Sequence, residues 1–367
     1  MRFIYYMRNY KDIVLIAILL LAPVFGHAQS FKNAQSVVLA HTWGSQRLPG
    51  AIWGIAVSDV DGDGIEETLL LKSNQLVVGH INDNGFVPES TYEWDGLLEA
   101  VKLYTVNLDD DAAEEIIVSA MEANRPSSFG LKFTDGKFET LFSKAPWHLR
   151  VLRDNIGKLL IGQQWDTTSF FQGPIYFLSV EGKKIKRGER LPLPKWATIY
   201  NFDALGTDSR LVRIEPYEHV MIYEKRGKKF KRIWSSGGRY GGGLNLVDFE
   251  ARQPLGEANQ EGVIINREPL VITGGTPLIL AVEHDVPLKG VIGRRAWIPR
   301  GKIVAFGEDP SLGFQNKFET VEIQGYIADY AVFEKKLIVP VQIQPSMWRE
   351  NEESTLLIFD LPITSIQ

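Results

Sequence analysis

Cysteine is absent from all 367 residues of the chain. This absence excludes disulfide bonds, thiol nucleophiles and lipid attachment at a cysteine. Stability must therefore come from a packed core, and the composition allows one, because 44% of the residues are hydrophobic and 23% are charged. With a net charge of -5, this is not the profile of a disordered chain or of a nucleic-acid-binding protein.

Long apolar runs are also absent, except at the N-terminus. There, three cations (Arg2, Arg8 and Lys11) precede an apolar run over residues 13–25. The run is short for a membrane span, and Gly26 and Ala28 then offer small residues at the two positions that a signal peptidase reads. The pattern predicts a secretory signal peptide.

We predict the signal peptide over residues 1–28 and a single mature domain over residues 29–367. Met7 can also serve as the start, and an uncleaved N-terminal anchor is the alternative. Cleavage takes the formal charge from -5 to -7. With no lipoprotein cysteine and no transmembrane span in the mature chain, we expect a periplasmic or secreted bacterial protein.

Catalytic motifs are missing from the mature sequence. It has no metal-binding H-E-x-x-H, no G-x-S-x-G elbow and no phosphate-binding glycine loop. His148 and His219 begin apolar segments, so we expect them to be partly buried and hydrogen-bonded rather than catalytic. We therefore predict no catalytic residue, although two carboxylates brought together by the fold would still allow glycoside chemistry.

An internal repeat is the strongest positive feature. GIAVSDVDGDGIEETLLL (residues 54–71) matches KLYTVNLDDDAAEEIIVS (residues 102–119) at an offset of 48 residues without a gap. The acidic positions agree, and so do the apolar ones. A repeat of this length is typical of solenoids and propellers.

Each copy predicts four strands. The first copy gives strands at residues 52–59, 67–73, 75–82 and 85–94, and the second at residues 99–107, 114–122, 127–134 and 137–143. Weaker copies follow, including ATIYNFD (residues 197–203) as the first strand of the fourth. After Trp234 the pattern blurs, and residues 244–323 hold one more set of strands with an insertion.

These repeats predict an all-β fold: a single β-propeller of four-stranded antiparallel blades. We count six blades, and a seventh could lie within residues 235–295. The last set is one strand short, so the N-terminal segment SVVLAHTW (residues 36–43) is expected to complete it and close the ring. A pair of β-sandwiches is the alternative.

The acidic loop DVDGDGIEE (residues 59–67) has the side-chain spacing of a calcium loop. The sequence does not favour an EF-hand here, because Leu70 occupies the position of its bidentate glutamate and the flanking segments have the pattern of β-strands. A loop between two strands of a blade fits better. The alternative is an acidic turn without metal, but converging carboxylates repel one another unless a cation neutralises them.

With its apolar flanks and blade spacing, the D-x-D-x-D-G-x-x-[DE] loop resembles the FG-GAP or VCBS repeat of integrin α-like β-propellers. The resemblance implies structural calcium in both loops. The implied ligands are Asp59, Asp61, Asp63, Ile65 (carbonyl) and Glu67 in the first copy, and Asn107, Asp109, Asp111, Ala113 (carbonyl) and Glu115 in the second. The second copy departs from the family pattern at Ala112, where a glycine is expected.

Two basic hairpins could bind an anionic ligand. One is KKIKRGER, from Lys183 to Arg190, and the other is KRGKKFKR, from Lys225 to Arg232. In a propeller, these equivalent hairpins could form one positive surface for anionic glycans or lipid headgroups. The alternative is two solvated hairpin tips that protect a sheet edge. No nucleic-acid partner is expected.

The sequence thus predicts an exported, non-enzymatic propeller with structural calcium loops. Its partner would be an unidentified protein or glycan of the bacterial envelope. The alternative is a carbohydrate-active enzyme, a polysaccharide lyase or hydrolase, on the same scaffold. That alternative predicts a deep axial pocket with clustered charged residues, whereas a shallow or plugged channel would contradict it.

Overall fold

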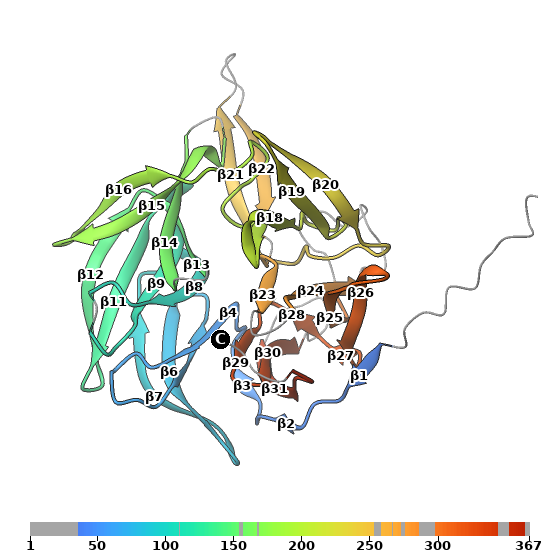
Figure 1. The fold of residues 1–367 in the computed structure, drawn as a ribbon. Coiled ribbons are helices and arrows are strands. Elements are labelled where there is room, and N and C mark those ends of the chain that lie inside the picture. Colours follow the sequence, from blue (N-terminus) through green and yellow to red (C-terminus); the bar gives the residue numbers. More distant parts are fainter. Residues whose placement is uncertain are drawn as a thin grey trace, which may run out of the picture. The chain divides into compact units, whose positions relative to one another are not determined.

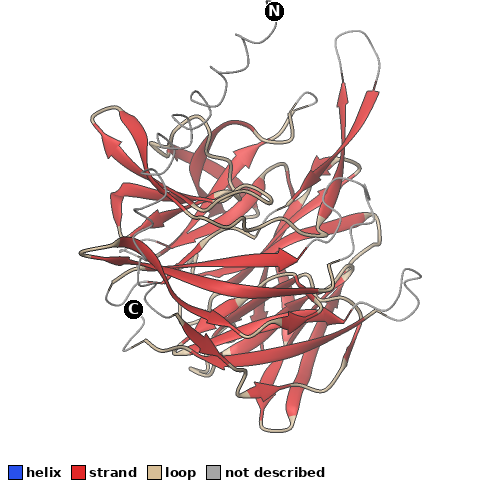
Figure 2. Ribbon diagram, turned by 90° about the vertical axis from the view of Figure 1, so that its right-hand side faces the viewer, coloured by secondary structure: helices blue, strands red, loops and turns tan. Residues whose placement is uncertain are grey.

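The computed structural model describes residues 36–109, 111–153, 157–166, 169–252, 258–265, 267–272, 276–285, 298–343 and 352–363. The predicted signal peptide lies outside these ranges. Within them the regular structure is β-strand throughout (Figure 2), and no helix there has the length and apolarity that a membrane crossing needs.

The first four blades follow one another along the chain and around a ring (Figure 1). Blade 1 comprises β4 (Gly54–Ser58), β5 (Glu67–Leu71), β6 (Gln75–Asn82) and β7 (Gly85–Glu93). Blade 2 comprises β8 (Leu98–Val106), β9 (Glu115–Glu122), β11 (Ser128–Thr134) and β12 (Lys137–Ala145), with the short β10 (Arg125–Pro126) paired to β9. Blade 3 comprises β13 (His148–Arg153), β14 (Lys158–Gln164), β15 (Gln172–Glu181) and β16 (Lys184–Arg190). Blade 4 comprises β17 (Phe202–Leu205), β18 (Thr207–Arg213), β19 (Met221–Arg226) and β20 (Lys229–Ser235).

An inserted hairpin, β21 (Leu246–Arg252) and β22 (Ala258–Ile264), separates blade 4 from blade 5 in sequence. Blade 5 comprises β23 (Leu270–Ile272), β24 (Leu278–Asp285), β25 (Arg300–Asp309) and β26 (Gly313–Thr320), with β27 (Ile323–Gln324) paired to β25. Blade 6 comprises β28 (Tyr326–Ile327) and β29 (Ala331–Phe333), then β30 (Lys336–Ile343) and β31 (Glu353–Asp360). The prediction of an all-β propeller with six antiparallel blades is confirmed.

The N-terminal segment closes the ring, as predicted, but with other residues. β2 (Trp43–Gly44) and β3 (Leu48–Pro49) pair with β31 and form the outer strand of blade 6. Residues 37–39 form β1 (Val37–Leu39), which instead runs parallel to β26 of blade 5. The predicted span, residues 36–43, was therefore too early, because its first half extends the edge of the neighbouring blade.

Ser354 fastens this closure from within the core. Its hydroxyl accepts a hydrogen bond from the Ile52 amide at 3.1 Å and donates one to the Gly50 carbonyl at 2.9 Å, and its side chain is fully buried. Ser354→Ala would leave a buried amide without a partner, so we expect a loss of about 1–3 kcal/mol of unfolding free energy in urea titrations. Ser90→Ala is the control: its exposed hydroxyl bonds Gly136, and we expect a change below about 0.5 kcal/mol. Equal effects in the two variants would contradict this role of Ser354.

The strand predictions hold for the first two copies to within about two residues, but the first strand of blade 4 was misplaced. Residues 197–203 were predicted, whereas β17 begins at Phe202. Residues 197–201 form turns that Asn201 fixes, since its Oδ1 accepts from the Thr198 amide at 2.9 Å. Ile199 and Tyr200 are nevertheless buried. Their apolar side chains therefore indicate contact with the core, and they do not indicate a strand.

The core lies between neighbouring blades. One cluster joins blades 1 and 2: it includes Val60, Leu69, Leu71, Leu76 and Val78 from the first and Leu103, Ile116, Val118, Leu131 and Phe133 from the second. Central strands such as β5 and β9 are buried on both faces because a blade contacts a neighbour on each side. This packing orients each blade so that its first strand lies innermost in the ring.

Candidate functional site

The innermost strands of all six blades surround an axial cavity of about 620 Å³. The lining comes from β4, β8, β13, β17, β23 and β29, together with residues 267–269, which follow the inserted hairpin. A cavity of this size suits a small-molecule ligand.

The cavity is covered at one end and open at the other. Lys102, Arg150 and Asp329 are buried at the covered end. Val57 and Arg153 are more accessible and lie at the open end. The covered end is where segments beside the inserted hairpin attach: Asn245 Nδ2 donates to the Val101 carbonyl at 3.2 Å, and the Leu244 amide donates to Tyr326 Oη at 3.1 Å.

The two acidic loops leave the ring at the open end, because they directly follow β4 and β8. They are joined there, since the Glu114 amide donates to the Asp59 carbonyl at 2.9 Å. The Glu114 carboxylate also accepts from the Ser58 hydroxyl and the Lys158 ammonium. The acidic loops of blades 1 and 2 therefore lie beside Lys158, which lines the cavity.

A cluster of paired charges occupies the covered part of the cavity. It contains three cations and three carboxylates, none more than 14% exposed: Lys102, Arg150, Arg267, Asp203, Glu268 and Asp329. Glu268 lies 3.2 Å from the Lys102 ammonium and 3.0 Å from the Arg267 guanidinium. Arg150 lies 3.3 Å from Asp203, and Arg267 also pairs with Asp329.

A tyrosine and two backbone amides also donate hydrogen bonds to carboxylates of this cluster. Tyr104 Oη donates to Glu268 at 2.8 Å. Asp329 accepts from the Ile55 amide at 3.1 Å, and Asp203 accepts from the Val271 amide at 3.3 Å. The cluster therefore joins all six blades across the axis, and ring closure brings its members together from distant parts of the sequence.

Burial and pairing act against each other on these carboxylates. Burial alone would raise the pKa of Glu268, but Lys102 and Arg267 hold it well below its ordinary value, so this carboxylate is ionised. Burial raises the pKa of Asp203 to about 6, against the opposing effect of Arg150. Because each of the three carboxylates has a cation partner, none is a free nucleophile or base.

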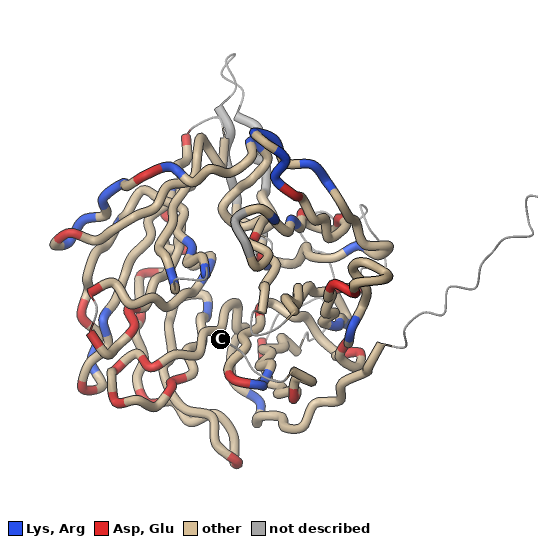
Figure 3. The backbone as a smooth tube through the Cα atoms, viewed as in Figure 1, with Lys and Arg blue, Asp and Glu red and all other residues tan. Residues whose placement is uncertain are grey.

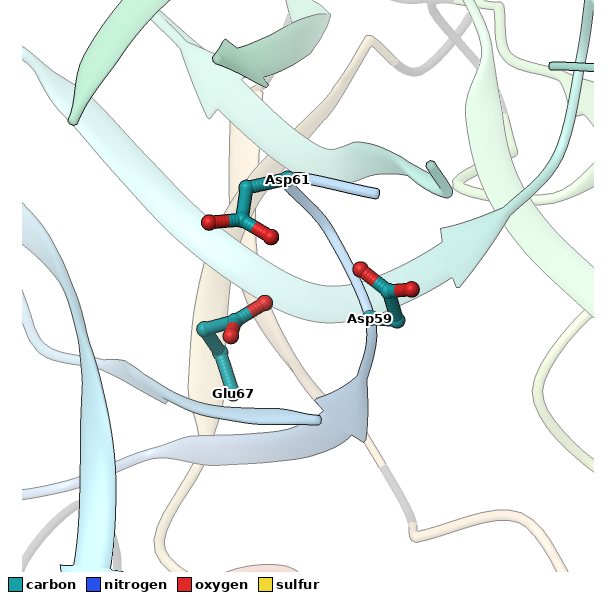
Figure 4. A group of neighbouring side chains, drawn as sticks. All are labelled: Asp59, Asp61 and Glu67. Atoms are coloured by element: carbon teal, nitrogen blue, oxygen red, sulfur yellow. The ribbon is translucent and has the colours of Figure 1, made fainter. Parts of the chain in front are cut away.

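In the first acidic loop, the carboxylates of Asp59, Asp61 and Glu67 face one another (Figure 4). One oxygen from each lies within 4.8 Å of the others. Two oxygens that each lie about 2.4 Å from one ion can be at most about 5 Å apart, so this spacing fits calcium. Gly62 and Gly64 have φ of 82° and 86°, a conformation that lets the backbone wrap around Asp59.

Asp63 and Glu67, two of the predicted ligands of this loop, have different surroundings. Asp63 stays outside the group, and its Oδ1 accepts from the Ile65 amide at 2.7 Å. Glu67 is fully buried, and burial raises the pKa of its carboxyl. His80 Nε2 lies 3.9 Å from Glu67 Oε1, and no lysine or arginine pairs with Glu67 among the described residues. A buried carboxylate with so distant a partner fits a metal ion, which would supply the missing positive charge.

In the second loop, Asp109, Asp111 and Glu115 form the equivalent group, but a lysine reaches it. The Lys132 ammonium lies 2.8 Å from Asp109, contacts Asp111, and lies 3.7 Å from Glu115. Hydrogen bonds to the two aspartates raise the pKa of Lys132. The other predicted ligands, Asn107 and Ala113, bond within the loop, where Asn107 Nδ2 donates to the Asp111 carbonyl at 2.5 Å and the Ala113 amide donates to Asp111 Oδ1 at 2.9 Å.

The two loops face different side chains from one equivalent position of the third strand, a histidine in blade 1 and a lysine in blade 2. Thr68 pairs with Gly79 and Ile116 with Leu131, so His80 and Lys132 are equivalent. Sequence reasoning missed Lys132, because the repeat was aligned only over the loop and its flanks. Aligning the third strands of the two copies would have revealed it.

The two basic hairpins are exposed outer edges of blades 3 and 4. Figure 1 places the β21–β22 hairpin between β16 and β20, and Figure 3 shows lysine and arginine gathered along β20. Several of these cations already have partners, such as Lys186 with Glu181 at 3.7 Å and Arg226 with Glu224 at 2.9 Å. Their arrangement fits two separate basic edges.

His148 and His284 are buried and hydrogen-bonded to the carbonyls of Phe170 and Ile327, at 2.8 Å and 3.0 Å. His219 Nδ1 bonds the Gly238 carbonyl at 2.8 Å. The expectation that His148 and His219 are hydrogen-bonded is thus confirmed. Burial lowers the pKa of both buried imidazoles to about 4.

These two imidazoles predict a loss of stability in acid. Between pH 6.5 and pH 4 the two imidazoles are protonated in the unfolded state but neutral in the folded state. The unfolding free energy therefore decreases as the pH falls. Each histidine contributes a decline of about 1.4 kcal/mol per pH unit in this window, and Asp203, with its raised pKa, offsets one of them below pH 6. Urea titrations of His148→Gln should show a shallower decline than those of the parent chain. Parallel declines would contradict neutral burial of His148.

No protein-family model matches the chain, and the comparison with curated proteins gives no match. The class of the protein therefore rests on its fold: it is a six-bladed β-propeller with an axial cavity.

Proposed function

We propose that the chain is an exported, non-enzymatic β-propeller that binds a small polar ligand or the end of a glycan in its axial cavity. The cavity carries this proposal: it is open at one end, has the volume of a ligand site, and is lined by polar side chains from blades 2, 3, 4 and 6 and from residues 267–268. The paired state of Asp203, Glu268 and Asp329 favours binding over catalysis, because a general base or nucleophile needs a free carboxylate.

The experiment is a glycan and metabolite binding screen on residues 29–367, with a variant that fills the cavity. Ala204 lines the cavity, so Ala204→Trp should abolish binding of any axial ligand. Val87→Trp is the control, since Val87 is half exposed on the outer strand β7. Binding that survives Ala204→Trp would place the ligand elsewhere and overturn the axial site.

A carbohydrate-active enzyme remains the second candidate, and one observation favours it. The cavity has the charged lining that this alternative predicts, and Asp203, with a pKa of about 6, could donate a proton. Polysaccharide turnover by the purified domain, lost in Asp203→Asn, would establish the enzyme and overturn the binding module.

Calcium in the first loop would brace the rim of the cavity. The donor set of Asp59, Asp61 and Glu67 and the resemblance of the loop to FG-GAP or VCBS repeats support this proposal. In the second loop, Lys132 provides a positive charge where a metal would otherwise be needed. We therefore propose that calcium binds first and most tightly to the blade 1 loop.

The basic hairpins remain a candidate for a second contact, with anionic glycans or lipid headgroups. Their exposure supports it, and the lysines would also protect the outer sheet edges. Cosedimentation with anionic vesicles, compared with neutral ones, tests the lipid arm.

A further inference from the structure

The charges that line the axial cavity are not balanced. Among the described residues, five cations line it against three carboxylates: Lys102, Arg150, Arg153, Lys158 and Arg267 against Asp203, Glu268 and Asp329. The chain as a whole has a net charge of -5, so a positive cavity runs against the overall charge. A concave site lined by one sign of charge concentrates the field and attracts the opposite charge.

The excess charge lies at the open end. The three deep cations are paired with the three deep carboxylates, and Lys158 pairs with Glu114 at the rim. Arg153, the exposed last residue of β13, has no carboxylate partner among the described residues. Burial and the nearby charge of Arg153 both lower the pKa of Lys158, because the two cations repel each other. Among the described residues, Glu114 at the mouth thus pairs with Lys158 but not with Arg153.

A donor inside the cavity is also unused. Arg150 is 2% exposed, lines the cavity, and has no hydrogen-bond acceptor for its Nε among the described residues. A buried donor without a partner is costly, and an oxygen of a ligand or a water would satisfy it. A polar ligand that extends from the mouth inward would therefore meet Arg153 first and the unsatisfied Nε of Arg150 after it.

We propose that the axial cavity selects small molecules that carry a carboxylate on a polar body, with Arg153 as the residue that recognises the carboxylate. This inference rests on the proposed axial binding function and adds its ligand class. An arginine matches a carboxylate in geometry, and a charge-assisted hydrogen bond is about twice as strong as a neutral one. Neutral ligands of the same shape would lose this contact.

The test uses residues 29–367 and a matched pair of probes, glucuronate and glucose, which differ in one carboxylate. Calorimetry should give at least about tenfold tighter binding of glucuronate, and Arg153→Gln should remove the difference. Arg187→Gln is the matched control, because Arg187 is exposed on β16 outside the cavity and should keep the preference. Acetate and inorganic phosphate serve as bare anions and should bind more weakly than glucuronate.

The outcomes separate the two proposals. Equal binding of glucose and glucuronate, both blocked by Ala204→Trp, would overturn the charge selection and leave the axial site standing. If acetate or phosphate bound as tightly as glucuronate, the claim that the polar body of the ligand contributes to binding would be overturned. Failure of both sugars to bind, or binding unchanged by Ala204→Trp, would overturn the axial function and the ligand class together.

Discussion

Glu268→Ala should lower the unfolding free energy by about 3–5 kcal/mol, the largest effect that we expect from a single substitution in this chain. The reason is the removal of a carboxylate that pairs with both Lys102 and Arg267 in the covered part of the cavity. The two cations would remain buried, one of them without any carboxylate. Urea titrations of the variant and the parent chain measure the difference.

Glu322→Ala provides the comparison for this prediction. Glu322 pairs with Arg300 at 3.1 Å, but both side chains are about half exposed, so the loss should be at most about 1 kcal/mol. A loss below about 1 kcal/mol in Glu268→Ala would show that water reaches the cluster and solvates the two cations in place of the carboxylate. The axial cavity would then be wetter than its burial indicates.

Calcium should raise the melting temperature of chelator-treated protein, and Asp61→Asn should abolish the rise. Asp61 belongs to the carboxylate group of the first loop, and an ion that binds only the folded state adds about 2.7 kcal/mol when its concentration is 100 times Kd. Differential scanning fluorimetry with and without calcium measures the effect. Absence of a shift in the parent chain would overturn the metal assignment.

Asp109→Asn is the matched control for Asp61→Asn, since it removes the equivalent carboxylate of the second loop. Lys132 already contacts that group, so the control should keep most of the calcium response. Lys132→Ala should instead create a second calcium site, visible as a second equivalent in calorimetry. Equal loss of the response in Asp61→Asn and Asp109→Asn would contradict the distinction between the loops.

Strand order and blade number could be predicted because they depend on local pattern. The repeated spacing of apolar residues and turns is visible within each copy, and four strands per copy leave few alternatives to a propeller. Where burial came without a strand, as at Ile199 and Tyr200, the prediction failed. Apolar character reports burial, whereas hydrogen bonding decides whether the backbone extends.

The acidic loops could be predicted only in part. Asp59, Asp61 and Glu67 do converge, as the spacing within one loop implies. The position of Lys132 was beyond reach of the loop motif, because it comes from the third strand of the blade. A motif defines the ligands that it contains, and other strands decide which charges face it.

The sequence by itself determined the class of fold, the place of the acidic loops and the N-terminal closure of the ring, since short-range periodicity and turn chemistry carry this information. Only the tertiary structure decided which charges meet on the axis. Lys102, Glu268 and Asp329 are far apart in the chain, and Glu268 lies in the region where the repeat pattern blurs. The energy of a charge depends on its distance from partners and on its burial, and both are properties of the closed ring.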